Sequence, residues 1–402
     1  MKRLLAGLVL LLCACGGPDA VDPGIINPGT GGIRAEGRGN VTDRFTAELW
    51  VHGNTGYTTT WGNRTSNGVA APGNAVKIWN VAGATPVLVD SVIIPGAGTL
   101  GDIQASADGR YLVVATEPAG SLVIFDIADP LKPRLITRYQ DANMATGVHT
   151  AEVQSVNGKL HAFLSVNPGS GIRSRLVVVD ISNPAAPVQV VAREMGAPFI
   201  HDVFVRDGIL MTALWNDGMT IFDIGGGGRG GSLADPVQIG NVKTAGGKAH
   251  NIHWFHDPVT GSKRYAFVGE EGPASIGTSA SGDVHVVDVS DMANPREVAF
   301  FNVPGAGAHN FSADEQRGIL YAAFYNGGVR ALNARGDLSA CTSDQRSADG
   351  RCDLAKMGRA VASGLTDVGV SVFVWGVQFT GGRLYASDML NGLWRLSPAS
   401  AP

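Results

Sequence analysis

Short apolar runs recur along the chain, and each is followed by a turn-forming Asp or Asn, usually with a nearby Pro. The clearest copies are "LVIFDIADPLKP" (122–133), "LVVVDISNPAAP" (176–187), "VHVVDVSDMANP" (284–295) and the shorter "MTIFDI" (219–224). Three weaker copies lie at 76–81, 329–334 and 393–398. An uninterrupted apolar run of this length is typical of a strand buried on both faces, and Asp or Asn with Pro is typical of a turn. The pattern therefore predicts seven equivalent strands.

Each copy is flanked by further apolar segments that read as neighbouring strands. A turn glycine and a second strand precede it, as in "DGRYLVVAT" (108–116). Another strand comes before that, as in "FIHDVFV" (199–205), and one follows the copy, as in "RLITRY" (134–139). Four antiparallel strands repeated seven times predict an all-β fold, a seven-bladed β-propeller with four-stranded antiparallel blades.

The two ends of the chain predict how the ring closes. The last copy ends at "LWRLSPASAP" without a fourth strand, and "GIRAEGRG" (32–39) precedes the first copy. We expect this N-terminal strand to join the last blade. A long β-solenoid or two sandwiches would also use many strands. Seven copies and a missing strand that the N-terminus can provide favour the propeller.

The segments 122–133 and 176–187 resemble the repeated strand of the LVIVD-repeat β-propeller proteins, which are exported bacterial proteins. The resemblance covers most of residues 43–400 and implies the architecture. It implies no reaction or ligand. Two blades depart from the repeat, because Asn80 and Asn333 stand where Asp is expected.

The N-terminus is typical of a targeting segment. Lys2 and Arg3 precede an apolar run (4–12), and the junction "LCAC" (12–15) resembles a bacterial lipoprotein cleavage box. We expect a lipoprotein signal peptide over 1–15 that ends at a lipidated Cys15, a Gly/Pro-rich flexible tether over 16–31, and the propeller over 32–402. An ordinary secretory signal is the alternative. The expected location is the outer membrane or cell surface, with the N-terminal lipid as the membrane contact.

Composition narrows the possible partners. The chain has 402 residues, 55 of them Gly, and a formal net charge of −4. It offers no basic surface that would predict nucleic-acid binding. We expect a monomer. The two remaining cysteines, Cys341 and Cys352, are expected to form a disulfide, because export permits one and no further metal ligands cluster beside them.

The histidines fall into a register that the repeat defines. Alignment of the first strands places His149, His201, His250 and His309 at the same position, and Asp102 at that position in another blade. Since the innermost strand lines the channel of a propeller, these side chains should ring one mouth of the channel. The ends of second strands should arrive nearby with Glu117, Asn167, Asn216, Glu270, Asn326 and Asp388. His253 and His256 lie further down one strand and are expected to be packed or solvated.

Two interpretations of this histidine set stay open. Each imidazole could cap its own blade through a hydrogen bond, because a repeat duplicates such a device automatically. Alternatively, the set forms a binding site, and imidazole with carboxylate suits Zn, Cu or Fe. An ion needs at least three donor atoms within about 2.0–2.2 Å of one point. A seven-fold channel can hold histidines of neighbouring blades too far apart for this, which counts against a metal site. We expect a mixed outcome, with His201 and His250 the most important for binding.

The expected function is binding rather than catalysis. The longest loops, 61–74, 167–174 and 270–283, should rise on the same face as the histidines, and recognition often resides in such loops. No H-E-x-x-H or G-x-S-x-G motif occurs. The sequence therefore predicts a binding or scaffold protein for a protein, glycan or small-molecule ligand. The alternative is a metal-dependent enzyme that uses Cu, Fe or Zn at a histidine-lined channel mouth.

Overall fold

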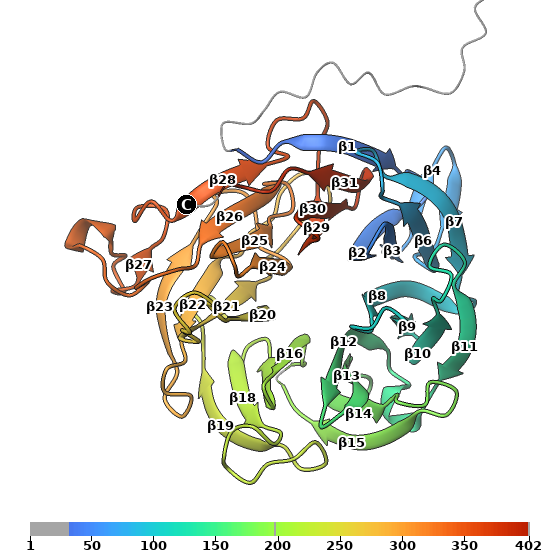
Figure 1. The fold of residues 1–402 in the computed structure, drawn as a ribbon, viewed down its shortest axis with the longest axis horizontal. Coiled ribbons are helices and arrows are strands. Elements are labelled where there is room, and N and C mark those ends of the chain that lie inside the picture. The colour runs from blue at the N-terminus through green and yellow to red at the C-terminus, as the bar shows by residue number, and fades with distance from the viewer. Residues whose placement is uncertain (1–31, 197, 401–402) are drawn as a thin grey trace, which may run out of the picture.

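The computed structural model describes residues 32–196 and 198–400. These residues form seven β-sheets arranged around a central channel and one small two-stranded sheet (Figure 1). The predicted seven-bladed propeller is confirmed. The expected signal peptide, the expected tether and Cys15 lie outside the described residues. Across the described part of the chain, no helix is long and apolar enough to cross a membrane.

The blades follow one another in chain order, each from the channel outward. Blade 1 contains β2 (Phe45–His52), β3 (Thr55–Trp61), β6 (Ala75–Asn80) and β7 (Val87–Ile93), with a hairpin of β4 (Arg64–Ser66) and β5 (Val69–Ala71). Blade 2 contains β8 (Ala97–Ala105), β9 (Tyr111–Pro118), β10 (Ser121–Asp126) and β11 (Arg134–Tyr139). Blade 3 contains β12 (Val148–Val156), β13 (Lys159–Val166), β14 (Arg175–Asp180) and β15 (Val188–Glu194). Blade 4 contains β16 (Asp202–Arg206), β17 (Ile209–Ala213), β18 (Met219–Asp223) and β19 (Val237–Val242).

The remaining three blades complete the ring. Blade 5 contains β20 (Ala249–Phe255), β21 (Tyr265–Glu270), β22 (Val284–Asp288) and β23 (Arg296–Phe301), with β27 (Cys352–Asp353) added at its outer edge. Blade 6 contains β24 (Phe311–Asp314), β25 (Ile319–Ala323), β26 (Val329–Asn333) and β28 (Ala360–Gly364). Blade 7 contains β29 (Val374–Thr380), β30 (Arg383–Asp388), β31 (Gly392–Leu396) and β1 (Ala35–Asn40). Two short 3₁₀ helices are described, η1 (Ala142–Met144) and η2 (Ser343–Gln345).

The N-terminal strand closes the ring, as the sequence predicts. Strand β1 pairs antiparallel with β31, so that Ala35 lies opposite Leu396. Gly39 is required there, because a Cβ atom at this position would lie 2.4 Å from the ring of Trp79 in blade 1. The first strand thus completes the last blade and contacts the first (Figure 1).

The repeated apolar strand and its turn have a physical explanation. In β14, Leu176, Val177, Val178 and Val179 are fully buried between adjacent sheets. The Asp that follows accepts a hydrogen bond from the backbone two residues later, as Asp180 does from Ser182 at 2.9 Å. The two blades with Asn in place of this Asp keep the same turn. The other bonds of this kind are Asp126 to Ala128 (2.8 Å), Asp288 to Ser290 (3.0 Å), Asn80 to Ala82 (3.0 Å) and Asn333 to Arg335 (3.0 Å). Asn serves because its side-chain oxygen accepts the same bond.

The expected disulfide between Cys341 and Cys352 is present. Cys352 begins β27, which runs parallel to β23 with Cys352 opposite Ala299. The crosslink therefore attaches the excursion between β26 and β28 to the outer edge of blade 5.

Candidate functional site

Aromatic side chains surround the channel at one face of the propeller. Ring-centroid distances trace the circle through neighbouring members: 5.8 Å for Trp61–His149, 4.4 Å for His149–His201, 4.0 Å for His201–His250, 4.1 Å for His250–His309, 4.2 Å for His309–Trp375 and 4.9 Å for Trp375–Trp61. We call these six residues the histidine ring. The sequence register placed its four histidines together, and the structure brings them into contact.

His201, His250 and Glu271 form the most convergent group in this ring. The Nε2 atoms of His201 and His250 lie 3.6 and 3.8 Å from Glu271 Oε2. Across the described residues, this is the group of three possible ligands whose donor atoms all lie within 4.8 Å of one another. Tyr325 donates a hydrogen bond to Glu271 Oε1 at 2.8 Å and so orients the carboxylate. The Nδ1 atoms of both histidines are buried without a partner.

His149 lies beside this group and has its own support. Its Nδ1–H donates to Glu117 Oε1 at 2.7 Å, and Asn167 donates to the other oxygen of Glu117 at 2.7 Å. Its Nε2 lies 3.0 Å from His201 Nε2. A carboxylate on the far nitrogen of an imidazole is the usual way to fix the tautomer and orientation of a metal-ligating histidine.

His309 has a different role from His201 and His250. Its Nδ1–H donates to the backbone oxygen of Trp375 at 2.6 Å. Trp375 belongs to the next blade, so the bond connects two blades instead of capping one. The structure thus shows both kinds of histidine within one ring, one bonded to backbone and the others facing a carboxylate.

The histidines that face Glu271 favour the neutral form. Burial, followed by the charges of neighbouring imidazoles, holds the pKa of His201 well below its usual value. Burial lowers the pKa of His250 to about 4. Burial acts in the same direction on His149, but the hydrogen bond and charge of Glu117 outweigh it and raise its pKa. A neutral imidazole has a free lone pair, which is the form that binds a metal ion.

Other predicted site residues lie elsewhere. Glu270 faces away from the ring toward His285, with Oε2 and Nε2 3.5 Å apart. Asp388 is fully buried and accepts hydrogen bonds from the backbone of Phe373 and the indole of Trp394, each at 3.0 Å. His253 and His256 do not join the ring. Glu271 and Tyr325 were missed, because both belong to irregular loops whose path the strand pattern does not define.

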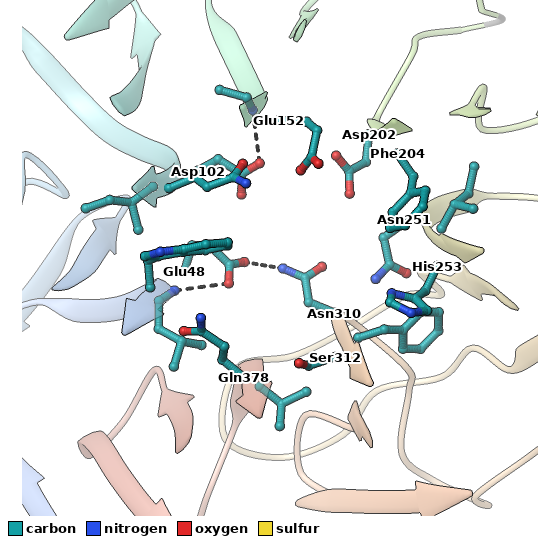
Figure 2. Close-up of a pocket in the computed structure, with 18 of the residues that line it drawn as sticks. Glu48, Asp102, Glu152, Asp202, Phe204, Asn251, His253, Asn310, Ser312 and Gln378 are labelled. Atoms are coloured by element: carbon teal, nitrogen blue, oxygen red, sulfur yellow. Dashed lines mark hydrogen bonds between the residues drawn. The ribbon is translucent and has the colours of Figure 1, made fainter. Parts of the chain in front are cut away.

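A larger chamber lies below the histidine ring, toward the middle of the channel (Figure 2). Its volume is about 350 Å³, and a cavity of about 20 Å³ beside the ring shares several of its wall residues. Asp102, which the sequence placed in the ring, lines both cavities. Its carboxylate accepts a hydrogen bond from the backbone of Ala151 at 3.0 Å. Asp102 therefore lies in the wall of the chamber and borders the ring, but it is not one of the six ring members.

Four carboxylates from consecutive blades face this chamber: Glu48, Asp102, Glu152 and Asp202 (Figure 2). Burial raises the pKa of Glu48 to about 8, of Glu152 to about 8 and of Asp102 to about 6, and it raises that of Asp202 well above its usual value. Their mutual repulsion acts in the same direction as burial. The channel therefore has an imidazole layer above a carboxylate layer.

Comparisons with known proteins agree with this architecture. The LVIVD repeat family model matches residues 97–141 and 173–192, which include all of blade 2 and, in blade 3, β14 with most of β15. No curated protein matches the chain. The crystal structure of Saccharomyces cerevisiae Sqt1 is similar, with a TM-score of 0.54 and 10% identity over 89% of this chain and 83% of that one, a likeness of fold alone. The chain is thus a seven-bladed β-propeller in which blades 2 and 3 match the LVIVD repeat.

Proposed function

We propose that this protein is a binding protein that holds a transition-metal ion at the mouth of its channel, between His201, His250 and Glu271. The convergence of two imidazole nitrogens and one carboxylate oxygen carries the proposal. Their separations of 3.6 and 3.8 Å are too long for hydrogen bonds. Donors around one ion with bonds of about 2.1 Å lie roughly 3.0–3.4 Å apart, so small side-chain rotations would complete the site.

The chemistry of these donors favours Zn²⁺ or Cu²⁺. Both ions accept neutral imidazole together with carboxylate, whereas Ca²⁺ and Mg²⁺ prefer oxygen ligands. Glu271 would supply negative charge, and Tyr325 would hold it in place. His149 lies 3.0 Å from His201 and is close enough to support or join the site after a small movement.

The rim of the same face supports a binding role. Three long loops between second and third strands surround the mouth, and each carries an exposed apolar side chain: Val69 (68% exposed), Ile172 (43%) and Ile276 (42%). Loops on a rigid scaffold are a usual place of recognition, and these side chains would be available to a bound molecule. The proposal assigns no reaction to the site.

Metal titration of the full chain tests the proposal. After treatment with a chelator, the protein is titrated with Zn²⁺ or Cu²⁺ by calorimetry, and the bound metal is measured by elemental analysis. We expect about one ion per chain. Because each change removes a ligand, His250→Ala and Glu271→Gln should weaken binding at least about tenfold, or ~1.4 kcal/mol.

Two further histidine variants serve as controls. His256→Ala removes a buried imidazole just after the strand that carries His250 but outside the ring, and it should keep the affinity. His309→Ala should keep most of the affinity but lower the free energy of unfolding by about 1–3 kcal/mol, because it breaks a buried hydrogen bond. A wild-type protein that binds neither ion, or equal losses in His250→Ala and His256→Ala, would contradict the proposal.

A further inference from the structure

The chamber below the histidine ring has a one-sided distribution of charge. Its innermost strands contribute Glu48 from β2, Asp102 from β8, Glu152 from β12 and Asp202 from β16. The other three blades contribute polar groups: Asn251 and His253 from β20, Asn310 just before β24, Ser312 from β24, and Gln378 from β29. Among the described residues that line the chamber, none is Lys or Arg. The only other titratable group there, His253, lies 3.7 Å from Glu315 outside the chamber.

The hydrogen bonds of these carboxylates come from uncharged donors. Glu152 accepts from the Gln154 amide at 2.8 Å. Asp202 accepts from the backbone of Val203 at 2.7 Å. Glu48 accepts from the backbone of Leu49 at 3.0 Å and also from the Asn310 side chain. Neutral donors orient the carboxylates but leave their charge uncompensated. Like charges held around one space repel one another and favour the protonated form, and a cation entering the chamber would stabilise the ionised carboxylates by removing that repulsion.

Asn251 points independently to a missing ligand. Its side chain is 4% exposed, and its Oδ1 atom has no hydrogen-bond partner. Figure 2 shows the nitrogen end of this amide directed into the chamber, whereas Oδ1 lies against Gly269 of β21. Rotation of the amide would exchange its two ends, and a donor group on a bound molecule would then recover the free energy that the unpaired oxygen costs.

The arrangement favours an organic cation over a metal ion. The chamber's carboxylates do not form a group of three whose oxygens lie within 4.8 Å of one another among the described residues, so they do not converge on one ion. The volume of about 350 Å³ suits a small molecule. Trp50 and Phe204 contribute aromatic walls that can contact methylene groups or a cation.

We propose that this chamber binds a short aliphatic diamine, with each ammonium group placed between carboxylates on different blades and its methylene chain against the aromatic walls. Gln154 and Phe204 also line a second cavity, of about 610 Å³, beside the β16–β17 turn. That turn lies on the face opposite the histidine ring, so the diamine enters without crossing the ring. The site is separate from the proposed metal site.

Calorimetry on the full chain with 1,4-diaminobutane tests the inference. Butylamine tests the need for a second charge, and 1,4-butanediol tests the need for any charge. We expect saturable binding of the diamine at least tenfold tighter than that of the monoamine, and none of the diol. The affinity for the diamine should fall as salt is raised, because salt screens the attraction.

Charge-neutral variants locate the site. Glu152→Gln and Glu48→Gln keep the side-chain shape and should each weaken diamine binding at least about tenfold. Glu194→Gln is the matched control, since Glu194 is 53% exposed at the outer edge of the same blade as Glu152. Thermal melts confirm that each variant is folded, and having two chamber variants keeps the test valid if one is not.

Specific outcomes would overturn the inference. These are equal binding of the diamine and the diol, no saturable diamine binding at millimolar concentration, or the same affinity in Glu152→Gln, Glu48→Gln and Glu194→Gln. Tight Ca²⁺ binding without diamine binding would identify the chamber as a metal site instead. His250→Ala should keep diamine binding, so a failure of the metal site and a failure of this inference are distinguishable.

Discussion

Single carboxyl groups in the chamber should determine how stability depends on pH. Glu152 has a pKa raised from 4.5 to about 8 in the folded protein, because burial disfavours its charged form. Between these values the folded state retains a proton that the unfolded state releases. The free energy of unfolding therefore falls progressively as pH rises from about 5 to 8. Above the folded pKa of Glu152 it falls no further on account of this group.

We expect Glu152→Gln to be more stable than the wild type at pH 9 and nearly equal to it at pH 4. The gain should be on the order of 1–3 kcal/mol, below the full value of the shift, because a carboxylate that faces a partly open chamber is screened by solvent. Urea unfolding at both pH values in the absence of amines measures it. Glu194→Gln should show no such pH dependence. A gain of equal size at pH 4 and pH 9 would contradict the explanation.

Residue positions were predictable where they follow the repeat and unpredictable where they do not. His149, His201, His250 and His309 share a register, so sequence alignment alone brought them together. Glu271 could not be distinguished from Glu270, because a step of one residue at a strand end turns the side chain to the opposite face. Glu270 ends β21 and contacts His285, whereas Glu271 begins the loop and faces the histidines.

At the level of strands, the apolar pattern predicted the elements but not their bulges. Strand β8 shifts register between Leu100 and Ile103 where it pairs with β9. Asp102 lies inside this irregular stretch, and His149 and His250 lie inside similar stretches of β12 and β20, so simple alternation does not define the level of these side chains in the channel. A bulge redirects side chains and leaves little trace in hydrophobic periodicity.

The disulfide should stabilise the excursion between β26 and β28 and, through it, the edge of blade 5. Cys341 and Cys352 are 11 positions apart, and closing so short a loop contributes about 2–3 kcal/mol. Cys341→Ser/Cys352→Ser should lower the free energy of unfolding by this amount. Chemical unfolding of the oxidised wild type and the double variant measures it. Reduction of the wild type should reproduce the loss, and an unchanged stability in both cases would contradict the role.

For the whole molecule, the blade count and ring closure followed from the number of repeats and the missing last strand. The carboxylate chamber did not follow from them. Glu48, Asp102, Glu152 and Asp202 come from four blades and do not form a repeated motif. Only the closed ring places them around one space, so no local sequence signal marks them.

The expected attachment of the whole molecule to a membrane depends on Cys15, which lies outside the described residues. We propose that this cysteine carries lipid, since "LCAC" (12–15) resembles a lipoprotein cleavage box. Cells expressing the full chain should incorporate radiolabelled palmitate into it. Cys15→Ala should abolish the label, and Cys13→Ala should retain it. Labelling that persists in Cys15→Ala would refute the proposal.

Because β1 pairs with β31, the ring can close only when both strands have been synthesised. The strand synthesised first has its partner, β31, near the far end of the sequence, with Ala35 opposite Leu396. Until β31 is available, β1 has no neighbour within its blade, and blade 7 lacks its outer half. A chain that stops short by even one strand would therefore expose unpaired strand edges, which promote aggregation and degradation. Closure of the ring therefore makes correct folding depend on the presence of both strands, and a shortened chain remains open to degradation.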